Sequence, residues 1–102
     1  MGLTIKRIAR ATGPGRYLDE KGLYLQVASE RNRSWLFRYE RGGRERWMGL
    51  GALSDFTLAE ARERARKARQ LLADDVDPID ARKFAHVIGA KARSGVFDLP
   101  AE

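Results

Sequence analysis

Residues 34–50 alternate between apolar and polar side chains on both sides of a Gly-Gly pair, and this pattern restricts the fold more than any other feature. Side chains alternate between the two faces of a strand, so Trp35, Phe37 and Tyr39 share one face. Gly42-Gly43 favours a two-residue turn in which both central residues have positive φ. The segment therefore predicts an antiparallel hairpin whose apolar face belongs to the core.

The same alternation extends to the returning strand and to the segment before the hairpin. The returning strand would place Met48 and Leu50 toward the core, with Glu45 and Trp47 on the opposite side. Residues 22–28 alternate as well, with Tyr24 and Gln26 opposite an apolar face formed by Leu23, Leu25 and Val27. We expect an antiparallel sheet of three strands, or of four strands if Arg16–Asp19 adds a brief one.

One long helix is predicted after the hairpin. Thr57-Leu58-Ala59-Glu60 is a capping box, in which the threonine hydroxyl accepts from the backbone and the glutamate reaches back. Apolar residues then form one stripe at helical spacing: Leu58, Ala61, Ala65, Ala68, Leu71 and Leu72. The expected fold class is α+β, with the sheet packed on one long C-terminal helix and with a short N-terminal helical turn in residues 3–10.

The chain has 102 residues, enough for one small domain, which we place at residues 1–78. Residues 79–102 are expected to be a linker or tail, although 79–92 could form another helix that Gly89 disfavours. Three apolar residues of this segment, Phe84, Val87 and Ile88, could dock on the domain, pair with another copy or begin a following domain.

Composition excludes several classes of site. The chain has no cysteine, and its single histidine, His86, has no second imidazole with which to share a metal. It also has no apolar run of ~18 residues and no nucleophile or phosphate-loop motif. We therefore expect a non-catalytic cytoplasmic domain with no cofactor, no metal, no membrane contact and no small-molecule substrate.

The positive charge lies in the first half of the chain. The net charge is +6, and residues 1–53, with eleven basic and five acidic residues, hold the whole excess. Fifteen of the 20 basic residues are arginines, whose planar guanidinium suits phosphates and guanine edges. This distribution favours a polyanion as partner, while a solvated face that promotes solubility is the alternative interpretation.

Candidate DNA contacts follow from the predicted faces. If the helix covers the apolar face of the sheet, the opposite face is free to enter the major groove of a duplex. Arginine and glutamine on that face could reach base edges, and arginines in the turns could contact phosphates. The candidate DNA-binding residues are therefore Tyr24, Gln26, Arg31, Arg33, Arg38, Arg41, Arg44 and Arg46.

Two pairs of side chains on the same face have more than one interpretation. Glu40 and Glu45 could pair with arginines across the strands or accept from a cytosine amino group. Tyr24 and Trp47 could form a contact patch or be covered by one of the chain ends.

Several short motifs occur here in a specific order. They are Asp19-x-x-Gly22-Leu23-Tyr24-Leu25-x-Val27, Ser34-Trp35-x-Phe37-Arg38-Tyr39, Gly43-x-x-Arg46, Leu50-Gly51, Leu58-Ala59-Glu60-Ala61-Arg62 and Asp77-Pro78. Together they resemble the N-terminal arm-type DNA-binding domain of tyrosine recombinase integrases of prophages and genomic islands, over residues 3–78.

The resemblance implies a function for the chain. It implies a three-stranded sheet that enters the major groove of arm-type double-stranded DNA sites and tethers catalytic domains lying downstream, with other integrase protomers as partners. It also implies that Tyr17, Tyr24 and Tyr39, which belong to the strand motifs, are not the recombinase nucleophile, so we expect the chain to be a non-catalytic fragment or a truncated gene.

Two other functions compete with this interpretation. One is a double-stranded RNA-binding module with a related element order, although the predicted helix has no lysine cluster at its start. The other is a protein-interaction domain that uses Tyr24 and Trp47, with the arginines serving as a solubilising rim.

Overall fold

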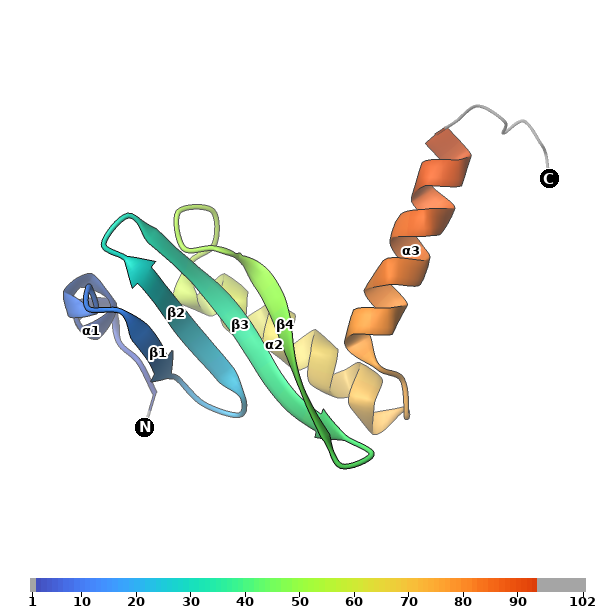
Figure 1. Ribbon diagram of the computed structural model, residues 1–102, viewed down its shortest axis with the longest axis horizontal. Helices are drawn as coiled ribbons and strands as arrows, with labels where there is room; N and C mark the ends of the chain where they lie inside the picture. The colour runs from blue at the N-terminus through green and yellow to red at the C-terminus, as the bar shows by residue number, and fades with distance from the viewer. Residues whose placement is uncertain (1, 94–102) are drawn as a thin grey trace.

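Four antiparallel strands in the order β1-β2-β3-β4 form one meander sheet, and a helix covers one of its faces (Figure 1). The computed structural model describes residues 2–93, with side chains described through residue 85. The elements are α1 (Ile5–Arg10), β1 (Gly15–Leu18), β2 (Leu23–Ser29), β3 (Asn32–Arg41), β4 (Arg44–Ala52), α2 (Leu58–Ala73) and α3 (Pro78–Arg93).

The core lies between the sheet and α2. Phe37 of β3 lies opposite Leu23 of β2 and Met48 of β4, and Trp35 lies opposite Leu25, so apolar residues of three strands share this face. The facing side of α2 contributes only small buried residues: Ala61, Ala65 and Ala68. Their small size lets the helix approach the aromatic side chains closely. The buried residues of the sheet and of α2 confirm the predicted core faces.

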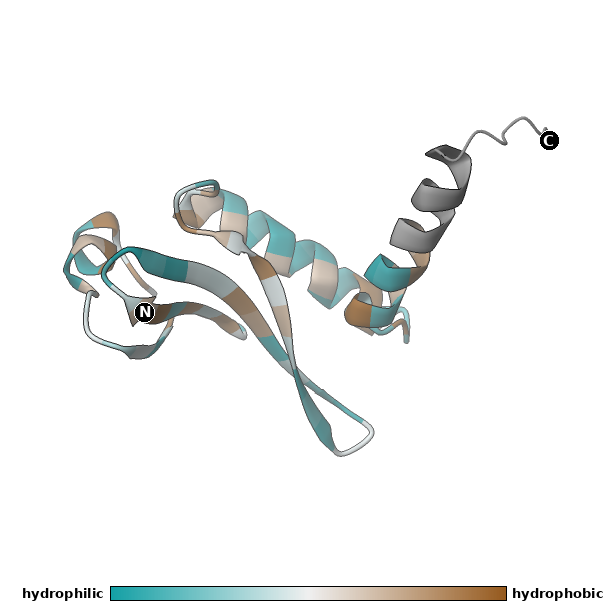
Figure 2. Ribbon diagram, turned by 45° about the horizontal axis from the view of Figure 1, so that its top comes forward, coloured by the Kyte–Doolittle hydropathy of each residue, from teal (hydrophilic) through white to brown (hydrophobic). Residues whose placement is uncertain are grey.

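The β3–β4 hairpin extends beyond the rest of the sheet. Its turn residues Gly42 and Gly43 have φ values of 60° and 78°, as the Gly-Gly pair predicts. The β2 pairing ends at Leu23 opposite Phe37, whereas β3 and β4 remain paired as far as Arg41 opposite Arg44. We call this two-stranded extension, residues 38–47, the ribbon. Figure 2 shows it as a hydrophilic projection from the body.

The structure decides between two expected strand numbers and corrects the number of helices. The sheet has four strands, one of the two numbers that the alternation allows and one more than the resemblance implies, because β1 pairs with β2 from Gly15 opposite Val27 to Leu18 opposite Tyr24. Residues 2–93 also contain two long helices rather than one, since α3 follows α2. Asp77 begins α3 by accepting the backbone N–H groups of Ile79 and Asp80 at its side chain, and the helix continues through Gly89, which was expected to disfavour it.

The two flanking helices leave the second face of the sheet open. The segment before α1 packs on the helix-covered side, where Leu3 joins the core and its carbonyl accepts from Arg62 of α2. Helix α3 runs away from the sheet (Figure 1), and Phe84 is 67% exposed, so Phe84 does not dock on the domain. The side chains of Val87 and Ile88, and the expected tail from residue 94, lie outside the described residues.

Candidate nucleic-acid interface

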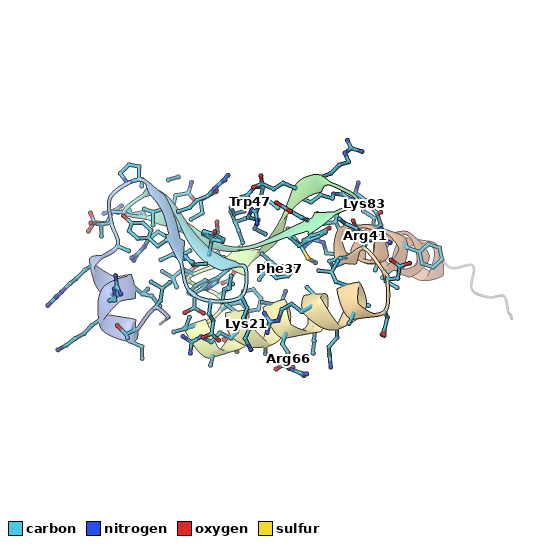
Figure 3. All side chains as sticks on the ribbon, turned by 90° about the horizontal axis from the view of Figure 1, so that it is seen from below. Lys21, Phe37, Arg41, Trp47, Arg66 and Lys83 are labelled. Atoms are coloured by element: carbon cyan, nitrogen blue, oxygen red, sulfur yellow. The ribbon has the colours of Figure 1, made fainter. Side chains whose placement is uncertain are left out.

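The sheet face turned away from α2 carries a mixed set of side chains, which we call the open face. Register places on it Arg16, Leu18, Tyr24, Gln26, Ser34, Leu36, Arg38, Glu40, Glu45 and Trp47. Figure 3 shows the two faces through two labelled residues, with Phe37 between the sheet and α2 and Trp47 on the opposite side. No segment of the described chain covers this face, so it is available to a partner.

An aromatic cluster occupies the middle of the open face. The ring centroids of Tyr24 and Trp47 are 5.1 Å apart in an edge-to-face arrangement. The guanidinium carbon of Arg16 lies 4.0 Å from the centroid of the Trp47 ring, a cation–π contact. Leu18 at the edge is 55% exposed. Of the two interpretations for Tyr24 and Trp47, the structure excludes a cover formed by the described chain ends.

Arg16 also orients one predicted base-contacting side chain. Its Nε donates to Oε1 of Gln26 at 3.2 Å, and the two residues are register partners in β1 and β2. The cation–π contact and this hydrogen bond together fix the guanidinium of Arg16 at two points. Arg16 was not among the sequence-predicted site residues, because its position on the open face depends on the short strand β1 joining the sheet.

A charged triad occupies the ribbon on the same face. Glu40 and Glu45 lie directly opposite each other, and Arg38 bridges them. The Nη2 atom of Arg38 lies 2.7 Å from Oε2 of Glu40, and its Nε lies 3.0 Å from Oε2 of Glu45. Both hydrogen bonds raise the pKa of Arg38, and the one to Glu45 has the larger effect. Of the two interpretations for the glutamates, cross-strand pairing with an arginine is therefore present.

Three predicted DNA-contacting arginines lie on the helix-covered side instead. Arg33 donates to the carbonyl of Ile8, and Arg41 donates to the backbone and side chain of Asp75. Arg46 lies 3.0 Å from Oδ2 of Asp77. Their alternation with core residues places them there, so the structure groups only Tyr24, Gln26 and Arg38 of the predicted set on the open face.

The remaining two predicted arginines lie in the turns at opposite ends of β3. Arg31 belongs to the β2–β3 turn and Arg44 follows the β3–β4 turn. Both are exposed, and within residues 2–85 neither forms an ion pair or a side-chain hydrogen bond. Their charges are therefore available to phosphate groups on either side of the open face.

Two buried aspartates support the site from behind, and the sequence predicted hydrogen-bond partners for neither of them. Asp19 accepts from the Leu3 backbone at 2.7 Å and from Nε and Nη2 of Arg62. Asp77 accepts from the Tyr39 hydroxyl and from Arg46. Burial alone would raise the pKa of both carboxyls, but these hydrogen bonds outweigh it and hold both pKa values below their usual range.

The described residues contain no other evident site. They include no cluster of three or more metal-ligating side chains. No helix among them has the length and apolarity needed to cross a membrane. The described residues form a small α+β domain with one open sheet face.

Comparison with known proteins identifies the family. Residues 3–85 match the Arm DNA-binding domain. The chain is 38% identical over 84 residues both to the integrase of Shigella phage Sf6 and to the prophage integrase IntS of Escherichia coli K12. It is 33% identical over 69 residues to the integrase of Enterobacteria phage P4. The chain therefore belongs to the Arm DNA-binding domain family.

The alignments cover unequal shares of the proteins compared. They include 79% of this chain but 22% of the Sf6 and IntS integrases, and 66% of this chain but 16% of the P4 integrase. The chain thus spans about a fifth of the length of these integrases and corresponds to their N-terminal part.

Proposed function

We propose that this chain binds arm-type sites in double-stranded DNA through its open face and serves as the DNA-anchoring part of a site-specific integrase. The observation that carries the proposal is that the potential base-contacting side chains, Gln26 and Arg38, are already oriented on a face that nothing in the described chain covers. Membership of the Arm DNA-binding domain family supports duplex DNA as the partner.

The ribbon is the part of the sheet that fits the groove best. Strands lie about 4.8 Å apart, so the outer strands of a four-stranded sheet are about 14 Å apart. The major groove of B-DNA is about 12 Å wide and accepts a two-stranded ribbon. The ribbon therefore inserts and brings Arg38 to the base edges and Trp47, at the rear of the ribbon, to thymine methyl groups. Tyr24 and Gln26 of β2 lie behind the ribbon on the same face and contact the bases that follow along the groove.

Among the predicted arginines, phosphate contacts fall to the two that form no ion pair or side-chain hydrogen bond within residues 2–85. Arg31 and Arg44 lie at opposite ends of β3, a strand of ten residues and about 30 Å. Phosphate contacts at the two ends fix the register of the sheet on the duplex without reading sequence. Arg33, Arg41 and Arg46 instead stabilise the fold that presents the open face.

In the complete integrase this domain holds a second DNA site at a distance from the recombining strands. Linking two binding modules raises the effective concentration of the weaker contact, so the domain tethers the catalytic regions of integrase protomers on bacterial DNA in the cytoplasm. Duplex RNA is a poorer fit, because the deep major groove of A-form RNA is too narrow to admit the ribbon.

The test starts with selection of bound sequences from a random duplex library by the full chain. Fluorescence anisotropy then compares the selected duplex, a scrambled duplex and duplex RNA at several salt concentrations. We expect the selected DNA to bind at least about tenfold more tightly than either competitor. Gln26→Ala should reduce that preference about tenfold, as expected for loss of a good bidentate base contact.

A second pair of variants tests the phosphate contacts. Arg44→Ala should weaken binding to all duplexes by a similar factor and lower the slope of log affinity against log salt by about one. Arg66→Ala removes the same charge from the far side of α2 and should leave the slope nearly unchanged. The absence of any complex at low ionic strength, or equal binding of DNA and RNA, contradicts the proposed function.

A further inference from the structure

The triad puts negative charge on the most prominent part of a basic domain. Glu40 and Glu45 are register partners, and like charges directly opposite each other destabilise a sheet. With Arg38 between them, the open face of the ribbon carries a net charge of −1 in a chain of +6. Exposed ion pairs contribute little to folding, so stability does not account for this arrangement.

The hydrogen bonds of Arg38 leave part of its guanidinium free. A guanidinium has five N–H donors, and Glu45 and Glu40 each occupy one, at Nε and Nη2. Three donors, on Nη1 and Nη2, have no partner among the described residues, and the two carboxylates fix the plane in which they lie. A planar pair of free donors matches the two adjacent acceptors O6 and N7 of guanine.

We propose, on the basis of the proposed function, that Glu40 and Glu45 are positioning residues that make the ribbon selective for a G·C base pair. Arg38 donates to O6 and N7 of guanine while both ion pairs stay intact. The second oxygen of Glu45 accepts from N4 of the paired cytosine. An A·T pair in the same place offers no two adjacent acceptors to Arg38, so its guanidinium loses one hydrogen bond.

The carboxylates also act against incorrect complexes. On a duplex that lacks this G·C base pair, both glutamates enter a groove of high negative potential. No base amino group then lies where Glu45 could accept from it while Arg38 binds the neighbouring base. Removing one carboxylate should therefore strengthen binding to unrelated DNA while weakening the preference for the selected site. A role limited to charge would change the first quantity and leave the second unaltered.

The test uses Glu45→Gln and Glu40→Gln, with Glu63→Gln as the matched control. Glu63 also forms an ion pair with an arginine, Arg66. Glu63→Gln therefore breaks a comparable ion pair and changes the net charge by the same amount. Arg66 lies on the side of α2 away from Trp47 (Figure 3), remote from the open face. Anisotropy measures binding of each full-length variant to the selected duplex, its single G·C→A·T variants and the scrambled duplex, after thermal melting confirms folding.

We expect one G·C position in the selected duplex whose replacement weakens the wild-type chain about tenfold or more. Glu45→Gln should reduce that penalty to about threefold or less and strengthen binding to the scrambled duplex about threefold, with Glu40→Gln acting in the same direction. Glu63→Gln should keep the full penalty.

Three results overturn the inference. The first is an equal penalty in the Glu45→Gln and Glu63→Gln proteins. The second is a wild-type chain that binds selected DNA with no dependence on any G·C position. Both leave the proposed function intact, whereas a wild-type chain that binds no duplex removes the proposed function together with this inference.

Discussion

At the scale of single residues, two buried carboxylates join parts of the chain that are far apart in sequence. Asp19 links the N-terminal segment to Arg62 of α2, and Asp77 links Tyr39 to the start of α3. Asp19 is 1% exposed and Asp77 is 6% exposed. A buried carboxylate needs such partners, because an unpaired one would lose its hydration without compensation.

Asp19→Asn should reduce the free energy of unfolding at pH 7 by about 2–3 kcal/mol, because Arg62 loses its carboxylate partner. The pKa of Asp19 in the folded chain lies below its unfolded value. Its contribution is therefore present above about pH 4 and is lost as the pH falls through the folded pKa. Urea unfolding at pH 7 and at pH 2.5 should show the gap to wild type closing. The exposed neighbour variant Glu20→Gln should change little, and a gap that persists in acid contradicts the prediction.

Tyr39 should titrate separately from ordinary tyrosines. Burial has the largest effect on Tyr39, followed by the hydrogen bond to Asp77 and the charge of Asp77. Together they raise the pKa of Tyr39 to about 12. The stability that its neutral form contributes is complete below about pH 10 and is lost as the pH rises through the folded pKa. Near-ultraviolet absorbance should detect this late ionisation in the wild type and not in Tyr39→Phe, which should also be about 1–2 kcal/mol less stable.

The sequence predicts where some of these side chains lie but not which partners they have, for physical reasons. Period-two alternation places Arg38 on the open face correctly, and the same rule places Arg46 beside Met48 and Leu50 on the core side. The acceptors of Arg46 could not be predicted, because Asp77 lies 31 residues away and local spacing says nothing of it. The predicted DNA contacts themselves remain predictions.

At the scale of elements, a glycine marks the point where β4 departs from regular pairing. Leu36 pairs with Gly49 and Trp35 with Gly51, so one extra residue of β4 is accommodated there as a bulge. Gly51 has φ of 121°, and a Cβ atom on it would overlap the Phe56 ring. That ring belongs to the turn into α2, and the Phe56 carbonyl accepts from the Trp35 indole.

Gly51→Ala should therefore destabilise the chain by about 2 kcal/mol or more, since both the backbone and the Phe56 ring must shift. Gly49→Ala, two residues away on the same strand, is the matched control, because a Cβ there meets no atom within 4 Å. Thermal and urea unfolding of the two variants should differ clearly. Equal losses of stability would show that the bulge tolerates a side chain.

The capping box of α2 gives a smaller expected effect. The Thr57 hydroxyl accepts from the Glu60 backbone at 3.1 Å, and the Glu60 carboxylate accepts from the Thr57 backbone at 2.8 Å. Thr57→Ala should cost about 1 kcal/mol in urea unfolding, while Thr57→Asp should retain most of the stability. The start of α2 could be predicted from four consecutive residues, because all the contacts of its cap lie within them. The start of α3 was not, because its cap, Asp77, also serves two residues of the hairpin.

At the scale of the whole molecule, the domain boundary is a question of packing. We placed the boundary at residue 78, and this placement remains a prediction. Pro78 is fully buried and Ile79 packs against the core, whereas Phe84 is exposed. Within the part of α3 whose side chains are described, the contacts with the domain therefore lie at the start of the helix, where Arg82 also donates to the Gly49 carbonyl.

Truncation tests this distribution of contacts. A chain ending at residue 85 should unfold within about 1 kcal/mol of the full chain, because the residues it lacks follow the exposed part of α3. A chain ending at residue 76 should lose about 3 kcal/mol or more, since Tyr39 and Arg46 lose Asp77 and the core loses Pro78. Circular dichroism during urea unfolding distinguishes the two. Similar losses in both chains would contradict this account.

The attachment of Asp77 has a mechanical consequence. One carboxylate accepts from Tyr39 and Arg46 of the hairpin and also caps α3, so a rotation of the hairpin would carry the beginning of α3 with it. A helix of 16 residues is about 24 Å long, so a rotation of about 10° at this joint moves its distant end by about 4 Å. Through this joint, a small change in the orientation of the hairpin would become a larger displacement at the far end of α3.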